Sequence, residues 1–248
     1  MLFQSASFAV FLVVVLFVHW AIVNRRDARF TFLLLASYVF YGSYELWYLS
    51  LIFASTFLDY YCGGRIHRAR TQGERTRFLL LSLAGNLGLL CFFKYTDWAI
   101  DSIELACGWL GFHPGLHALE YRLLPQALFD GVTGRILVPV GISFYTFQTL
   151  SYTIDIYRGN LTPARNLKEF ALFVAFFPQL VAGPIVRAVD FLPQLDERPR
   201  LRRHDLHEGM YRLGTGLVKK VVIADLIGRY VVDPVYASPG DYSLLGHV

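Results

Sequence analysis

The hydrophobic run at residues 176–188 constrains the fold of this chain more than any other segment. Pro178 and Pro184 interrupt the run, and Arg187 lies at its end. A proline inside a helix removes a backbone hydrogen bond and clashes with the preceding turn. Backbone polar groups cannot remain unbonded in lipid, so a broken run at membrane depth is buried in protein or lines a cavity. The segment is therefore the first place to look for a buried polar path.

The composition is that of a membrane protein. Of the 248 residues, 55% are hydrophobic and only 17% are charged, whereas soluble domains carry about 25% charged residues. The net charge of +4 lies in short loops between apolar runs, as orientation signals do, and does not indicate a nucleic-acid partner. We therefore predict an all-α polytopic membrane protein, a multi-helix bundle in a lipid bilayer.

The apolar runs predict the membrane spans, since a bilayer core needs about 20 residues. The first 23 residues contain no secretory cleavage pattern, so the first run is expected to remain as a helix. The predicted spans and shorter apolar runs are 2–23, 30–41, 46–61, 78–95, 136–157, 170–189 and 210–232.

Basic loops set the predicted topology, because they stay in the cytoplasm. The loops at 24–29, 61–77 and 158–168 are basic, whereas the turn at 42–45 and the loop at 96–135 are not. The N-terminus is therefore predicted to lie outside.

The broken segment conflicts with this topology if it crosses the membrane. A full span at 170–189 would place the basic loop at 187–205 on the outer side. The conflict disappears if the segment enters and returns on the cytoplasmic side. We therefore predict a re-entrant segment near 170–189, with a kinked full span as the alternative.

A polar stripe marks the predicted 136–157 helix. Tyr145, Gln148, Tyr152 and Asp155 are spaced by three, four and three residues, which places them on one helical face. Such a face turns to the bundle interior or to a water-filled cavity, or it simply hydrogen-bonds neighbouring helices. Asp155 is expected to pair with Arg158 near the helix end.

Two further acids have predicted surroundings. Asp59 ends the 46–61 run and is expected to form a salt bridge with Arg65 near the interface. Asp225 lies five and six residues after Lys220 and Lys219, a spacing that is poor for an α-helical pair.

Catalytic and metal-binding patterns are not evident. The three cysteines, Cys62, Cys91 and Cys107, form no C-x-x-C motif and no Cys/His cluster at metal spacing. None of the seven histidines accompanies a serine, a cysteine and an acid in a catalytic arrangement. The sequence therefore predicts no metal and no disulfide, and it assigns no catalytic residue.

Several stretches together resemble the alginate O-acetyltransferase type of the membrane-bound O-acyltransferase family. They occur in the family's order and cover roughly residues 30–236. The stretches are 37–42, 86–95, 138–159, 176–188 and 216–225.

The resemblance implies an O-acyltransferase that passes an acetyl group toward an exopolysaccharide hydroxyl, as in alginate biosynthesis. It implies helices and re-entrant pieces around a tunnel in the bacterial inner (cytoplasmic) membrane. The donor, most simply acetyl-CoA, would enter from the cytoplasm, and no cofactor would stay bound. Partners would be other exopolysaccharide biosynthesis proteins, including a periplasmic acetyltransferase.

The chain departs from the family in one respect. The family's signature histidine lies in a Trp-His-Ile/Leu-Ser-like motif after the matched stretches, and no such motif occurs here. Residues 1–248 are therefore expected to form a single membrane domain that is the N-terminal part of a longer one, incomplete and inactive alone.

The resemblance makes the polar stripe and the broken segment candidates for the tunnel wall. The candidates are Tyr145, Gln148, Tyr152, Gln179 and Arg187. Arg187 would bind an anionic group of the donor, or it would only set orientation or contact lipid headgroups.

Two other functions remain open. A transporter or channel would also use broken helices, but it would show matching broken segments in two halves, and the sequence shows one. A truncated, inactive scaffold is the other alternative.

Overall fold

The structure is a computed structural model that describes residues 5–112, 114–131, 133–180 and 183–238. These residues are helical or irregular, with one isolated bridge between Phe129 and Ile136 and no extended strand among them. The all-α prediction is thus confirmed for the described part. These described residues divide into two compact units, one within residues 10–198 and one made of residues 5–9 and 199–238.

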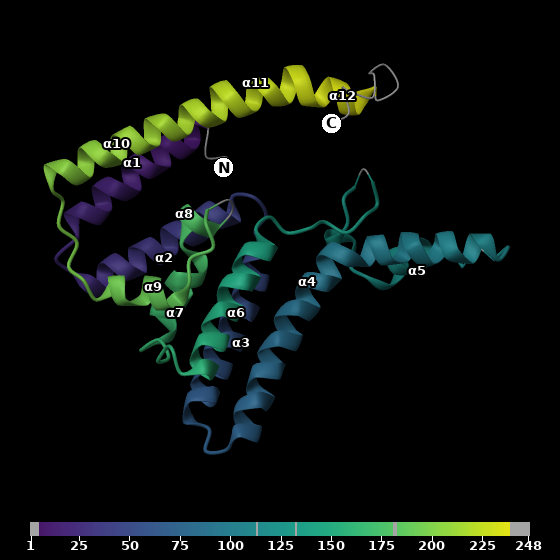
Figure 1. Ribbon diagram of the computed structural model, residues 1–248, viewed down its shortest axis with the longest axis horizontal. Helices are drawn as coiled ribbons and strands as arrows, with labels where there is room; N and C mark the ends of the chain where they lie inside the picture. The colour runs from purple at the N-terminus through teal and green to yellow at the C-terminus, as the bar shows by residue number, and fades with distance from the viewer. Residues whose placement is uncertain (1–4, 113, 132, 181–182, 239–248) are drawn as a thin grey trace. The chain divides into compact units, whose positions relative to one another are not determined.

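Three helices form the centre of the first unit. They are α3 (Tyr48–Arg68), α4 (Gln72–Trp109) and α6 (Ile142–Arg158), which lie side by side in Figure 1. A turn joins α3 to α4, and the Thr71 hydroxyl caps α4 by accepting a hydrogen bond from the Glu74 N–H at 3.2 Å. The runs at 46–61 and 78–95 are therefore helical, and both helices extend beyond the predicted bounds.

The predicted start of the 136–157 helix was wrong. The helix α6 begins at Ile142, after Gly141, which has a positive φ of 80°. That backbone conformation suits glycine and lies outside the helical region, while Pro139 just before it cannot donate a helical hydrogen bond. Residues 136–141 thus form a non-helical lead into the helix, with a turn at residues 140 and 141.

The helices α3 and α6 approach each other closely at Gly63. A Cβ atom on Gly63 would lie 2.6 Å from Cε1 of Tyr152 and 2.9 Å from Cδ1 of Ile156. Small residues at helix contacts in membrane proteins permit such close backbone approach. Gly63 therefore sets the distance between the two helices.

We expect Gly63→Ala to destabilise the first unit by about 1–3 kcal/mol, because the added methyl overpacks the contact. The measurement is the free energy of unfolding in mixed detergent micelles. Gly64→Ala is the matched control, since its Cβ would meet no atom within 4 Å. Equal stability of the two variants would contradict this packing.

The broken segment packs against α2 (Arg26–Gly42) and α6. It consists of α7 (Leu167–Ala175), α8 (Phe177–Leu180) and α9 (Ala188–Phe191), followed by the 3-10 turn Leu192–Leu195. Asn166 caps α7 by accepting the Glu169 N–H at 2.9 Å. The predicted break between 170 and 189 is thus confirmed at Phe176, whose ψ of 109° is not helical.

The remaining described elements of the first unit extend it. The helix α1 (Ala6–Ala21) begins in the second unit, and α5 (Leu116–Leu123) and the 3-10 turn Gln126–Leu128 follow α4. Among the described helices, α4 is the one long and apolar enough to cross a membrane by length and composition, and α1 is a shorter apolar helix. The other predicted spans fall on helices that are shorter or more polar.

The second unit contains a run of helical turns. It comprises α10 (Arg203–Leu217), α11 (Asp225–Ile227), α12 (Asp233–Ala237) and the π-helical segments Val218–Ala224 and Gly228–Val232. Lys220 forms an ion pair with Asp225, although the sequence suggested a poor spacing. That prediction assumed an α-helix, whereas a π-helix aligns residues five apart.

Candidate functional site

The broken segment leaves backbone groups that other parts of the chain must satisfy. Because α7 ends at Ala175, Phe177 donates its N–H to the Ser37 hydroxyl at 3.2 Å rather than to the preceding turn. The Phe173 carbonyl accepts two side-chain amides instead, from Gln148 at 2.7 Å and from Gln179 at 2.9 Å. Two of the predicted tunnel residues therefore meet at one carbonyl, and together they anchor the break.

Arg187 joins the returning end of the segment to α6. Its Nε lies 3.2 Å from Oδ2 of Asp155, and its Nη2 pairs with Oδ1. Asp155 is only 1% exposed, whereas the Arg187 side chain is 51% exposed. A guanidinium held by two bonds to one carboxylate is fixed in orientation, and its outer edge remains accessible.

The predicted pairing of Asp155 with Arg158 was therefore wrong. Asp155 lies on the buried face of α6, and Arg158 at the end of that helix is exposed. The cation that reaches the buried face comes from a segment 32 residues further along the chain.

The two predicted tyrosines have different surroundings. The Tyr152 hydroxyl accepts the Ala164 N–H at 3.2 Å, and its ring centroid lies 4.2 Å from that of Phe170. Tyr152 thus holds the loop between α6 and α7. Tyr145 is fully buried, and its hydroxyl has no hydrogen-bond partner among the described residues.

A second polar network lies between α3, α4 and α6. Asp59 is 0% exposed and accepts hydrogen bonds from Ser82 at 2.6 Å and from Asn86 at 2.9 and 2.8 Å. The Asn86 carbonyl oxygen accepts from Ser55 at 2.6 Å and from Thr149 at 3.3 Å. The Asp59 carboxylate is thus satisfied by hydrogen bonds from neutral side chains, whereas Asp155 is paired with a cation.

The predicted Asp59–Arg65 salt bridge was also wrong. Arg65 stacks over the Phe78 ring, with its guanidinium carbon 4.9 Å from the centroid. The polar network itself was missed, although a signal exists in the sequence. Each of the three helices contributes two polar residues four apart, which lie on one face: Ser55 and Asp59, Ser82 and Asn86, and Thr149 and Thr153.

A basic pocket of about 650 Å³ lies where the end of α3 meets the loop before α7. It is lined by the last turns of α3 and by residues 162–167 before α7, and the charge pattern assigns both regions to the cytoplasmic side. Its basic side chains are Arg65, His67, Arg68 and Arg165. Their charge favours an anionic ligand.

Other loops that are predicted to be cytoplasmic also lie at this end of the first unit, near the end of α3. Arg26, from the loop at 24–29, pairs with Glu169 at 3.1 Å and with Asp196 at 2.7 Å, and Arg165 binds both oxygens of Asp196. Gln72 donates to the Tyr157 hydroxyl at 2.7 Å. The segment from Leu167 to Arg187 therefore begins and ends at one end of the unit.

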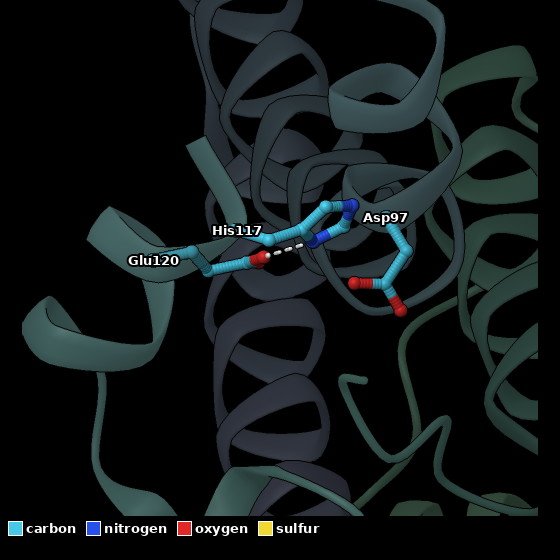
Figure 2. A group of neighbouring side chains, drawn as sticks. All are labelled: Asp97, His117 and Glu120. Carbon is cyan, nitrogen blue, oxygen red and sulfur yellow. Dashed lines mark ion pairs between the residues drawn. The ribbon is translucent and has the colours of Figure 1, made fainter. Parts of the chain in front are cut away.

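One group of side chains could hold a metal ion. Asp97, His117 and Glu120 offer ligand atoms that all lie within 4.8 Å of one another (Figure 2). Cys/His motif spacing does not reveal this group, because the group consists of two carboxylates and a single histidine that is twenty residues from Asp97.

Comparison with known proteins finds relatives that are named as O-acetylases or O-acetyltransferases. The chain is 38% identical over 230 residues to the probable alginate O-acetylase AlgI of Azotobacter vinelandii, covering 91% of this chain and 42% of that protein. The corresponding protein of Pseudomonas aeruginosa is 37% identical over 229 residues, covering 92% and 40%. The peptidoglycan O-acetyltransferase of Helicobacter pylori is 31% identical over 219 residues, covering 78% and 38%.

The chain is thus homologous over about nine tenths of its length to alginate O-acetylases, the type that its motifs predicted. It spans about two fifths of the length of these relatives. No family model matches the chain, and no solved structure matches it.

Proposed function

We propose that this chain forms the donor-side part of a membrane O-acyltransferase that passes an acetyl group toward an exopolysaccharide hydroxyl, as in alginate. The observation that carries the proposal is the docking of the broken segment on α6 in a chain homologous to O-acetylases over nine tenths of its length. The relatives are named for alginate or for peptidoglycan, so the test distinguishes these two polymers as acceptors.

The segment between Leu167 and Arg187 is proposed to be re-entrant in the bacterial inner membrane. The basic loops that lie together at one end support a common cytoplasmic side. The side-chain amides on the Phe173 carbonyl support burial of the break at membrane depth, since protein groups there replace the missing helical bonds. The N-terminus would then lie outside, and the chain would be multi-pass.

The basic pocket is proposed to receive the acyl donor. Acetyl-CoA is the simplest donor, and its phosphates complement the arginines that line the pocket. Arg187 would bind a second anionic group or orient the donor beside α6. The acceptor, or a periplasmic acetyltransferase that relays the acetyl group, would approach from the other side.

Acyl transfer to a hydroxyl also requires a base, because the attacking oxygen must lose its proton. No histidine here is assigned that task, and the resemblance places the family's histidine motif beyond the matched stretches. The residues of this chain are therefore proposed to bind and orient the donor and to exclude water.

The test is polymer-bound acetate in a host that lacks its own O-acetylase. We would express the chain alone and, separately, a chimera in which it replaces the matching region of the Azotobacter vinelandii relative. We expect acetylated alginate with the chimera and none with the chain alone.

Acetate on peptidoglycan instead would change the acceptor and keep the reaction. A chimera that inserts into membranes but acetylates neither polymer would contradict the proposal and favour a scaffold.

A further inference from the structure

A cluster of charged side chains lies where the end of α4 meets α5, far along the chain from the broken segment. Asp97 and Asp101 lie one turn apart on α4, and His117 and Glu120 lie one turn apart on α5. Figure 2 shows the His117 ring between the other two labelled side chains, with Glu120 on one side and Asp97 on the other.

Contacts with the backbone hold these side chains in place. The Asp97 Oδ2 accepts the Ile136 N–H at 3.1 Å, which ties α4 to the non-helical lead into α6. Glu104 accepts the Leu116 N–H at 2.6 Å and thereby fixes the start of α5. These contacts fix the Asp97 carboxylate and the start of α5, the helix that carries His117 and Glu120.

Asp101 sets the orientation of the His117 ring. His117 Nε2 lies 2.8 Å from Oδ1 of Asp101, and Nδ1 lies 3.5 Å from Oε2 of Glu120. A neutral imidazole that donates Nε2–H to Asp101 presents the lone pair of Nδ1 to Glu120. This is the arrangement in which an outer carboxylate orients a metal-binding histidine.

Two carboxylate oxygens of the cluster are buried without a partner. Neither Oδ1 of Asp97 nor Oε1 of Glu120 has a hydrogen-bond partner in the described part of the chain, and Glu120 is 9% exposed. A buried carboxylate oxygen without a donor is costly.

The charge balance also calls for a cation. Four carboxylates meet in the cluster: Asp97, Asp101, Glu104 and Glu120. The positive groups that face them among the described residues are Arg135, which pairs with Asp101 at 3.1 Å, and His117 if it is protonated. Four negative charges against at most two positive charges leave an excess of negative charge.

We propose that Asp97, His117 and Glu120 bind one divalent metal ion of the zinc class, with Asp101 as the outer carboxylate. Imidazole nitrogen and carboxylate oxygen are common zinc ligands, at about 2.0–2.2 Å from the ion. The ligand atoms of the three residues lie within 4.8 Å of one another. A small movement of the side chains toward one another would place each ligand atom at about 2.0–2.2 Å from a shared ion. The ion would tie α5 to α4 and, through Ile136, to the lead into α6.

The test is zinc binding by the purified full chain in detergent. The protein is stripped with a chelator, dialysed, and titrated with Zn²⁺ alone by calorimetry, while bound metal is counted by elemental analysis. We expect one equivalent of zinc and a zinc-dependent rise in the unfolding temperature. Mg²⁺ and Ca²⁺ should compete weakly, since neither favours an imidazole ligand.

Variants of the proposed ligands distinguish specific zinc binding at this site from nonspecific binding elsewhere on the protein. We expect His117→Asn and Glu120→Gln each to abolish binding of the one equivalent of zinc. We expect Asp101→Asn to weaken the affinity for zinc by about 10–100-fold. His207→Asn and Glu197→Gln are matched controls at exposed positions and should bind as the wild type does. Circular dichroism of the metal-free variants checks that they fold.

Two results would overturn the proposal. One is that the metal-free wild-type chain binds no more zinc than His117→Asn does. That result would mean that protonation alone compensates the negative charge of the cluster. The other is full binding by a folded Glu120→Gln variant.

Discussion

Asn86→Leu is expected to destabilise the three-helix centre by about 3–5 kcal/mol, because it leaves the buried Asp59 carboxylate without its main donor. Asn86 supplies hydrogen bonds to both oxygens of Asp59 and accepts two more from Ser55 and Thr149. Leucine has a similar volume but can make none of these bonds. The measurement is the free energy of unfolding in mixed detergent micelles.

A double substitution tests the reason for the effect. Replacing both partners of a buried polar contact by apolar groups can be nearly neutral. We therefore expect Asp59→Leu combined with Asn86→Leu to be more stable than Asn86→Leu alone. Asn160→Leu, at an exposed position after α6, is the control for adding an apolar side chain. An Asn86→Leu variant as stable as the wild type would contradict the network.

Arg187→Ala is expected to lower polymer-bound acetate by about tenfold or more in the chimera, which corresponds to about 1.4 kcal/mol. This loss has two causes. The buried Asp155 loses the cation that pairs with it, and the proposed donor site loses a side chain that binds an anionic group of the donor. Arg158→Ala is the matched control, since Arg158 is exposed and lies three residues from Asp155.

The double variant Asp155→Leu with Arg187→Leu separates the two causes. Removing both charges should restore the free energy of unfolding, because no unpaired carboxylate remains buried. Acetate should nevertheless stay low if the guanidinium contacts the donor. Recovery of acetate together with stability would show that Arg187 only holds the segment in place.

The sequence predicted the features that depend on local chemistry. Pro178 and the surrounding apolar run indicated a break, and the structure ends α7 at Ala175, three residues before that proline. The spacing of Tyr145, Gln148 and Tyr152 indicated one helical face, and all three side chains are buried. Backbone restriction and helical periodicity act over a few residues, so a single sequence reveals them.

Partners across the fold could not be predicted in the same way. Asp59 and Asp155 were assigned to the nearest arginine in the sequence, but their partners come from α4 and from the segment before α9. Sequence distance is a poor guide once helices pack, because a buried acid binds whatever donor the packed neighbour presents. The Asp97, His117 and Glu120 cluster was missed for the same reason.

The segment from Leu167 to Arg187 is proposed to enter and leave the membrane on the cytoplasmic side. The most direct measurement is labelling of single cysteines by a membrane-impermeant thiol reagent, in intact spheroplasts and in inverted vesicles. Asn160→Cys precedes the segment, Glu197→Cys follows it, and Glu45→Cys marks the predicted outer side, all at exposed positions. The three native cysteines would be replaced by alanine.

We predict that Asn160→Cys and Glu197→Cys are both labelled in inverted vesicles and protected in spheroplasts, with the reverse for Glu45→Cys. Labelling of Asn160→Cys and Glu197→Cys from opposite sides would show that the segment crosses the membrane and would contradict the re-entrant account.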